Sequence, residues 1–304
     1  MSSKAGSIPA AYWELTKPRL SFLSVLTALT GYFCSNPHPQ GGVDSKGLVS
    51  LALGTALAAG GCGALNMWME RQADSQMDRT KFRPLPSGLI KPLHALIFGT
   101  FLSIVGVGLV WKGANTLAGL LTLATVVSYL LFYTPLKTKT TWCTLVGSLP
   151  GAIPPIIGTA TKLGTIDTMG WWLFALLFFW QVPHFMSLAV MCRHDYERGG
   201  FKIATVADPT GRSAALWSIS FMIPMLFVVS AIAQTFFAPD CTSTLRGWMS
   251  PFIWVSLIAS IIFLKLSLDF MLPHRRNEVA KPFFLASILY LPVILLTLTL
   301  NRLF

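Results

Sequence analysis

The sequence predicts an all-α membrane protein: one domain, residues 1–304, built as a bundle of about nine transmembrane helices. Only 12% of the 304 residues are charged and 53% are hydrophobic, whereas a soluble domain carries about 25% charged residues. Apolar runs long enough to cross a bilayer, which takes about 20 residues, recur along the whole chain. No linker or low-complexity stretch separates these runs, so we expect a single domain whose partner is the lipid bilayer.

Each expected helix is an apolar run bounded by polar or turn-forming residues. The fifth run contains Pro150, Pro154 and Pro155, which a membrane helix tolerates when its neighbours satisfy the freed carbonyls. We therefore expect this helix to be kinked and packed among others. The nine runs lie at about 18–35, 47–68, 92–112, 115–134, 143–161, 169–192, 214–237, 249–271 and 282–302.

The basic residues are divided unequally between the two sides of such a bundle. Of the 23 Lys and Arg residues, 17 fall on the side of the N-terminus, five fall on the other side and Lys265 lies within a helix. Basic loops stay in the cytoplasm, so we expect a cytoplasmic N-terminus. The sequence shows neither a cleavable leader nor a transit extension, which points to a bacterial inner membrane. Topology accounts for the net charge of +11, so nucleic acid is not expected as a partner.

A first polar segment at the end of the second run carries a regular series of acidic side chains. Asn66, Glu70, Asp74 and Asp78 recur every four residues and would share one face of a helix. Stacked carboxylates repel one another, more strongly where the dielectric constant falls near a membrane, so the series indicates a compensating cation. Carboxylate and amide oxygens suit Mg2+, which proteins usually hold through one or two carboxylates plus substrate phosphates.

Basic residues follow the acidic series directly. Arg79, Lys81 and Arg83 suit phosphate oxygens, arginine through its planar fork. Acids and bases together therefore predict a diphosphate bound through a metal ion. The alternative is a helix at the membrane edge whose acids form weak surface ion pairs with Arg71, Arg79 and Lys81. The series begins at the end of an apolar run, where polar groups are costly, and this favours the binding site.

A second polar segment begins within the sixth run and continues past its end. Gln181, Pro183 and His184 interrupt an otherwise apolar helix, and polar groups at that depth are candidates for function. For the histidine, the alternative is a core residue bonded to a neighbouring carbonyl. Asp195 is the acid best placed to face the first segment, and Gly199 should end the helix that carries it. Further cations for a diphosphate here are Arg193, Arg198 and Lys202.

Six stretches of the chain resemble the UbiA superfamily of intramembrane prenyltransferases, and within it the group that farnesylates protoheme. Asn66, Glu70 and Asp74 match the family's first acidic motif, with Glu70 in an aspartate's place. The second motif departs from many relatives, because Met191 precedes Asp195 by four residues where another aspartate is usual. The six stretches, in the family's order, are 15–20, 77–85, 133–137, 147–155, 180–185 and 195–196.

The resemblance implies a UbiA-like fold and farnesyl transfer from farnesyl diphosphate to a vinyl group of heme B, giving heme O and diphosphate. It implies Mg2+ on Asn66, Glu70, Asp74 and Asp195, with Asp78 either as an outer ligand or as a hydrogen-bond partner of the ligands. Heme A synthase or oxidase assembly factors would be further partners. The alternatives are a relative that prenylates another aromatic acceptor, such as 4-hydroxybenzoate, and an ion or phosphate transporter, whose carboxylates belong near the bilayer midplane.

Under the same resemblance, the substrates would contact a wider set of side chains. Arg79, Lys81, Arg83, Arg193, Arg198 and Lys202 would bind the diphosphate. His184 would contact the heme, with His194 as its rival. The farnesyl cation needs a dry pocket with aromatic faces, and the side chains available for it are Trp68, Phe132, Tyr133, Trp180 and Phe185.

Overall fold

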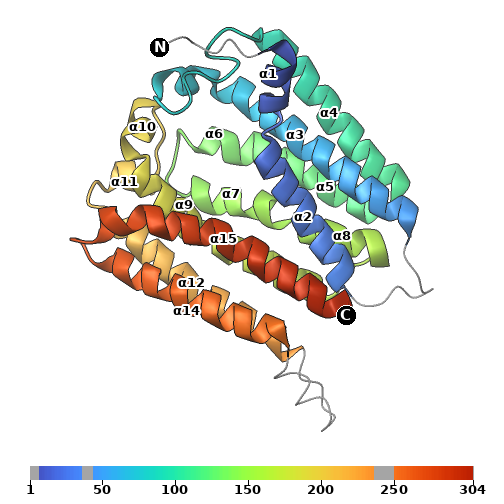
Figure 1. Ribbon diagram of the computed structural model, residues 1–304. Coiled ribbons are helices and arrows are strands. Elements are labelled where there is room, and N and C mark those ends of the chain that lie inside the picture. Colours follow the sequence, from blue (N-terminus) through green and yellow to red (C-terminus); the bar gives the residue numbers. More distant parts are fainter. Residues whose placement is uncertain (1–6, 36–43, 236–249, 304) are drawn as a thin grey trace.

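Long helices run side by side through the computed structural model, which describes residues 7–35, 44–235 and 250–303 (Figure 1). Eight helical segments in this part of the chain are long and apolar enough to cross a membrane. They are α3 (Ser45–Gln76), α4 (Pro92–Gly113), α5 (Thr116–Val127) continuing through the π-helix η1 (Ser128–Tyr133) and α6 (Thr134–Leu136), α7 (Cys143–Ala152) with α8 (Pro154–Leu163), α9 (Thr168–Met191), α12 (Arg212–Gln234), α14 (Pro251–Met271) and α15 (Arg276–Leu303).

The first of the nine expected spans corresponds to α2 (Pro18–Cys34). With 17 residues, α2 is shorter than the other eight spans. The predicted all-α bundle is thus confirmed, with helix ends mostly within a few residues of expectation. Two helices are longer than their apolar runs: α3 continues to Gln76 and α15 already begins at Arg276. The predicted helix ends at 236–237 and the start at 249 lie outside the described residues. Three short helices gather at one end of the bundle: α1 (Ile8–Leu15), α10 (Arg193–Arg198) and α11 (Ala204–Ala207) (Figure 1).

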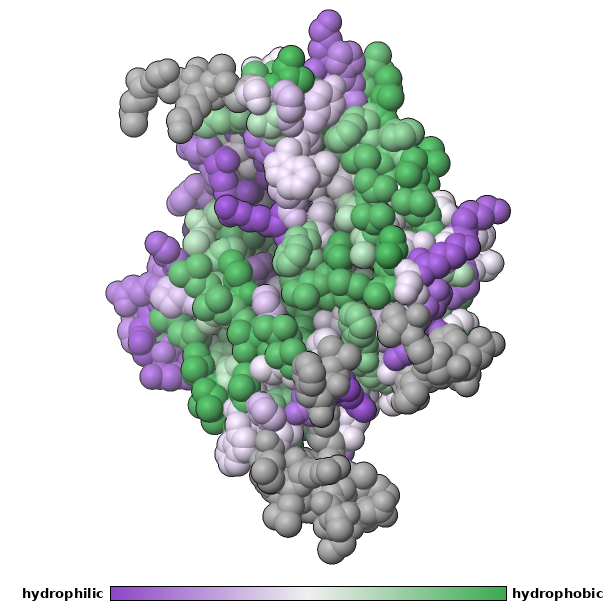
Figure 2. Space-filling view, turned by 45° about the vertical axis from the view of Figure 1, so that its right-hand side comes forward, coloured by the Kyte–Doolittle hydropathy of each residue, from purple (hydrophilic) through white to green (hydrophobic). Residues whose placement is uncertain are grey.

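Large apolar side chains cover much of the outer surface. Phe101, Ile104, Phe227 and Leu289 are each more than 60% exposed, and Figure 2 shows a broad apolar surface with polar residues mainly toward its margins. Soluble monomers rarely expose such contiguous apolar area. The protein is therefore an integral membrane protein.

Small residues let the helices approach closely on the inside of the bundle. A Cβ added to Gly61 of α3 would lie 2.7 Å from the backbone oxygen of Gly99 on α4, and one added to Gly54 would lie 2.8 Å from that of Gly106. Close backbone approach of this kind drives helix association in membranes. The α3–α4 pair therefore forms a firm support for the acidic face at the end of α3.

The expected kink in the fifth span is a break between two helices. α7 ends at Ala152 and α8 begins at Pro154, which lacks an N–H to continue the hydrogen-bond series. All eight residues from Pro154 to Thr161 in α8 are buried, and Ile157 belongs to a core cluster with Ala28 and Tyr32 of α2. Residues of α7, before the break, line two cavities inside the bundle.

Candidate active site

The end of α3 presents three polar side chains to one cavity of about 120 Å³. Asn66, Glu70 and Asp74 all line it, and Asn66 and Asp74 are at most 1% exposed. Because α3 stays helical through this region, the predicted common face is correct for these three. It is wrong for Asp78, because Met77 leaves the helix in an extended conformation (φ −99°, ψ 131°) and the side chain of Asp78 is 58% exposed.

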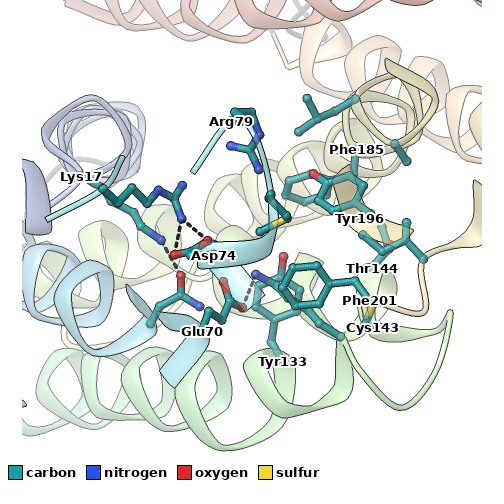
Figure 3. Close-up of a pocket in the computed structure, with 17 residues that line it drawn as sticks. Lys17, Glu70, Asp74, Arg79, Tyr133, Cys143, Thr144, Phe185, Tyr196 and Phe201 are labelled. Carbon is teal, nitrogen blue, oxygen red and sulfur yellow. Dashed lines mark hydrogen bonds and ion pairs between the residues drawn. The ribbon is translucent and has the colours of Figure 1, made fainter. Parts of the chain in front are cut away.

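Both carboxylates of this face are paired with cations from later in the chain. Arg83 Nη1 donates to the two carboxylate oxygens of Asp74, at 2.8 Å each. Lys137 Nζ lies 2.7 Å from Glu70 Oε1 (Figure 3). Burial opposes the charge on Lys137, yet the attraction of Glu70 and of the nearby tyrosines holds its pKa well above its ordinary value. These side chains, together with Asn66 and Lys17, surround one cavity and form a compact group that we call the charged layer.

The third member, Asn66, is bound by a lysine from the start of the chain. Lys17 Nζ donates to Asn66 Oδ1 at 2.5 Å, and Asn66 Nδ2 donates to Thr134 Oγ1 at 3.2 Å. Lys17 has φ +47° directly before Pro18, a left-handed conformation that costs an L-residue about 1–2 kcal/mol. Burial lowers the pKa of Lys17 to about 7, with Glu70 acting in the opposite direction. The backbone strain at Lys17 and the burial of its amino group are both costs of placing that group in the cavity.

The π-helix η1 supplies the aromatic side of the site. Tyr129 and Tyr133 lie in η1 with ring centroids 5.3 Å apart, and Lys137 Nζ sits 4.6 Å from the Tyr133 ring. A Cβ on Gly147 of α7 would lie 2.4 Å from that ring, so only glycine leaves room for it. π-Helical turns occur frequently at functional sites, and here the turn directs two rings toward the charged layer.

Asp195 contacts the loop after α3 and does not line the cavity. Its carboxylate accepts the backbone N–H groups of Asp78 and Arg79, at 3.1 and 3.2 Å, and pairs with Arg198, which lies 2.6 Å from Asp78. Burial works in the opposite direction, but these hydrogen bonds hold the pKa of Asp195 below its usual range. In the described part of the chain, no group of three or more His, Cys, Asp and Glu side chains is arranged to hold a metal.

The six predicted diphosphate-binding cations lie at different places. Arg79 and Arg83 line the cavity, whereas Arg198 pairs with Asp78 in the loop after α3 and with Asp195. Lys81 pairs with an exposed aspartate at 2.6 Å. Arg193 donates to a backbone carbonyl, and the side chain of Lys202 is exposed. His194 is also exposed, 3.9 Å from Glu197.

Two lysines of the charged layer, Lys17 and Lys137, were not predicted from the sequence as site residues. Both lie in stretches that carry the family resemblance, at 15–20 and 133–137, but both also flank a membrane span. Basic residues at that position are expected from topology alone. Only the packing of α2, α3 and α6 distinguishes these two from the other basic residues at that end.

A second cavity, of about 370 Å³, extends from the charged layer between the helices. It shares Lys17, Arg79, Tyr133 and Lys137 with the first cavity. The remainder is lined by α2, α3, α5, α7, α8, α9 and α15, with a surface that is mostly apolar and includes several Ser and Thr hydroxyls. A polar compartment thus opens directly into an apolar one, which suits an amphipathic ligand with an anionic head and a hydrocarbon tail.

Three of the five predicted aromatic residues face this cavity. Tyr133, Trp180 and Phe185 line it. Phe132 does not, because its ring is 57% exposed on the outside, and Trp68 packs instead against the cluster around α1. Tyr129, not predicted from the sequence, takes their place.

Known proteins resemble the chain over nearly its whole length. The profile of the UbiA prenyltransferase family matches residues 24–288. The chain belongs to this family. The protoheme IX farnesyltransferase of Opitutus terrae is 41% identical to this UbiA chain, over 96% of the chain and 95% of that protein. The protoheme IX farnesyltransferase of Solibacter usitatus is 38% identical, over 96% and 98%.

The fold is also shared with solved members of the family. A UbiA homolog from Archaeoglobus fulgidus bound to GPP and Mg2+ superposes with a TM-score of 0.64, covering 95% of this UbiA chain and 99% of that chain. At 16% sequence identity, this likeness concerns the fold alone. It confirms the expected UbiA-like bundle.

The oxygen donors of α3 fit the chemistry of magnesium. Two carboxylates and an amide oxygen face one cavity, with cations beside them that could contact phosphate. This is fewer donors than a closed protein cage for a metal would supply. It matches the usual mode of Mg2+ binding, in which one or two carboxylates act together with substrate phosphates and water.

Proposed function

We propose that this UbiA chain transfers the farnesyl group of farnesyl diphosphate to a vinyl group of heme B, giving heme O and diphosphate. The names of its relatives at 38–41% identity, protoheme IX farnesyltransferases, support the choice of substrates. The family supports prenyl transfer as the reaction class. The observation that carries the proposal is the direct opening of the charged layer into the apolar cavity.

The two cavities suit the two halves of farnesyl diphosphate. The diphosphate would lie against Arg79, Arg83, Lys17 and Lys137, and the isoprenoid chain would extend between α2, α3, α5 and α9. The C1 atom would then fall near Tyr133, where the two cavities meet. Aromatic faces stabilise positive charge, so the Tyr129 and Tyr133 rings would lower the energy of the allylic cation.

Asn66, Glu70 and Asp74 would hold Mg2+ in this proposal. The bound metal ion would neutralise charge that develops on the leaving diphosphate. Lys137 and Arg83, which neutralise Glu70 and Asp74, would turn toward the diphosphate oxygens. Removing one hydrogen-bond donor that is aimed at a developing anion typically costs about 10²–10³ in rate, about 3–4 kcal/mol.

Asp195 would act on the site through the loop after α3. By accepting the N–H groups of Asp78 and Arg79, it would fix the path of the backbone and so the place of the Arg79 side chain at the cavity. Arg198 forms ion pairs with both Asp195 and Asp78. Asp195 and Asp78 would then be positioning residues, and a role as metal ligands would require the loop to move.

The proposed location is the bacterial inner membrane, with the charged layer at the cytoplasmic end. Support comes from the 17 basic residues assigned to that side against five on the other. Heme A synthase or oxidase assembly factors would receive the product there. Fusing a reporter that is active only in the cytoplasm to each terminus would test this: activity is expected at the N-terminus and not at the C-terminus.

Extraction of hemes tests the proposed function directly. Purified chain is supplied with heme B, farnesyl diphosphate and Mg2+, and heme products are identified by mass. Heme O is expected, and its absence from a folded sample would contradict the proposal. Replacing heme B by 4-hydroxybenzoate tests the alternative acceptor, for which no prenylated product is expected.

A further inference from the structure

Heme O carries a hydroxyl group that neither farnesyl diphosphate nor heme B contributes, so the proposed reaction must also consume water. When the C1–O bond breaks, its electron pair leaves with the diphosphate. The vinyl π-electrons then bond the terminal vinyl carbon to C1, which leaves a cation on the carbon beside the porphyrin ring. A water oxygen bonds to that carbon and gives a protonated alcohol. A base must then remove one proton from this oxygen to leave the hydroxyl group. The inference below rests on the proposed function and concerns this last step.

On α9, Gln181 and His184 lie about one helical turn apart, and both line the apolar cavity, to which α2, α3 and α5 contribute Ser and Thr hydroxyls. Gln181 Nε2 donates to the backbone oxygens of Ser148 at 3.2 Å and Leu177 at 3.0 Å. Its two donor hydrogens are therefore used, and the acceptor Oε1 faces the cavity. A Cβ on Gly151 would lie 2.0 Å from Oε1, so this glycine leaves the space that Oε1 occupies.

The hydrogen bonds of Ser287 determine which nitrogen of His184 carries the proton. Ser287 Oγ lies 2.7 Å from His184 Nδ1 and 2.5 Å from the backbone oxygen of Phe284. A hydroxyl has one hydrogen, and the Phe284 carbonyl can only accept it. With this hydrogen donated to Phe284, Ser287 Oγ accepts from His184 Nδ1, and the imidazole is then the Nδ1–H tautomer. His184 Nε2 carries a lone pair, and within the described residues no hydrogen bond is made to it.

The imidazole ring is held firmly in this orientation. It stacks on Trp180 at 5.0 Å and on Phe284 at 4.9 Å, with interplanar angles of 20° and 26°. Trp180 Nε1 donates to the backbone oxygen of Ser287 at 3.0 Å, so the same residue on α15 fixes both rings. A histidine held through one nitrogen presents the other with a defined direction.

We propose that Gln181 Oε1 and His184 Nε2 bind the water that captures the vinyl-derived cation, and that His184 Nε2 takes up its proton. A water molecule that donates both hydrogens to these acceptors turns its oxygen lone pairs away from α9, toward the substrate. Elsewhere the cavity wall is largely apolar, which protects the allylic cation from early hydrolysis. An aromatic acceptor would instead lose a ring proton and need no water, so the pair is specific to a vinyl acceptor.

The test measures whether the vinyl-derived cation reacts with water or loses a proton. Without an oriented water and a base, the cation would lose a proton to give a farnesylated heme lighter than heme O by one water. His184→Gln and Gln181→Leu should each raise the ratio of this dehydrated heme to heme O by at least tenfold, by mass of extracted hemes. Reaction in ¹⁸O-labelled water should label heme O made by the unaltered protein. Ser260→Ala, which removes a buried hydroxyl bonded to Tyr290 away from the cavity, is the matched control and should leave the ratio unchanged.

Three results separate the inference from the proposed function. If both variants make heme O with an unchanged product ratio, the inference is wrong and farnesyl transfer stands. A changed heme absorption spectrum in His184→Gln with an unchanged ratio would assign Nε2 to the heme iron, which also overturns it. If the unaltered protein makes no farnesylated heme, the proposed function fails. Should His184→Gln yield no product at all, the ratio in Gln181→Leu decides alone.

Discussion

The two acidic segments lie at the same end of the bundle but differ in burial and in what they bind. On α3, the side chains of Glu70 and Asp74 are 10% and 1% exposed and pair with Lys137 and Arg83. Near α10, the Asp195 side chain is 14% exposed, but its partner Arg198 is 48% exposed, and Arg198 also pairs with Asp78, which is 58% exposed. Exposed ion pairs contribute at most about 1 kcal/mol, whereas charges in a low-dielectric cavity interact strongly. The comparison indicates that the α3 segment binds a charged ligand, whereas the α10 segment holds the loop after α3 in place.

Removing the charge of Asp74 should have the largest effect on activity. Asp74→Asn keeps the shape of the side chain but removes a proposed metal ligand and the partner of Arg83, so heme O formation should fall by about 100-fold or more. The rate is measured by mass of extracted heme. Ser75→Ala, on the exposed side of the same helix, is the control. Near-normal activity of Asp74→Asn would refute the role of the α3 segment.

Lys137 tests whether the buried pairs serve stability, catalysis or both. Lys137→Met leaves Glu70 buried without its partner, which typically costs about 3–5 kcal/mol, so the thermal midpoint in detergent should fall. Adding Glu70→Gln should restore much of the midpoint but not heme O formation. If the double variant regains activity as well, the pair is structural only.

Asp195 should matter less than Asp74. In Asp195→Asn one side-chain oxygen remains to accept the N–H of either Asp78 or Arg79, so we expect roughly a tenfold loss of activity, about 1.4 kcal/mol. Amide hydrogen exchange should speed up in residues 77–83 and stay unchanged at the end of α3. A loss as large as that of Asp74→Asn, with no change in exchange, would favour Asp195 as a metal ligand instead.

Asp208, in the loop before α12, should have the smallest effect and depend on pH. Hydrogen bonds from Thr210 and Ser213 lower its pKa to about 2, with burial acting weakly in the opposite direction. Because this lies below the unfolded value of 3.8, the stability it confers is present above about pH 4 and is lost as the pH falls toward 2. Asp208→Asn should lower the thermal midpoint slightly at pH 7 and by less at pH 3. An equal decrease at both would contradict the assignment.

Local sequence patterns predicted the helices and one face of α3, but not the partners of that face. The spacing of Asn66, Glu70 and Asp74 follows from helical periodicity. Their cations come from the start of α2, from the end of α6 and from the loop after α3, and such pairing depends on tertiary packing. Asp78 continued the four-residue spacing, yet the helix ended before it. A spacing rule contains no information on where a helix stops.

The most direct test of the central claim is binding of a non-reactive farnesyl diphosphate analogue, such as the thiodiphosphate, to the purified chain with and without Mg2+. We predict that chelating Mg2+ weakens binding at least tenfold, about 1.4 kcal/mol. Asp74→Asn should bind weakly whether or not Mg2+ is present, whereas Asp195→Asn should keep the Mg2+ dependence. Binding that is independent of Mg2+ in the unaltered chain, or unimpaired in Asp74→Asn, would contradict a metal-bound diphosphate at the end of α3.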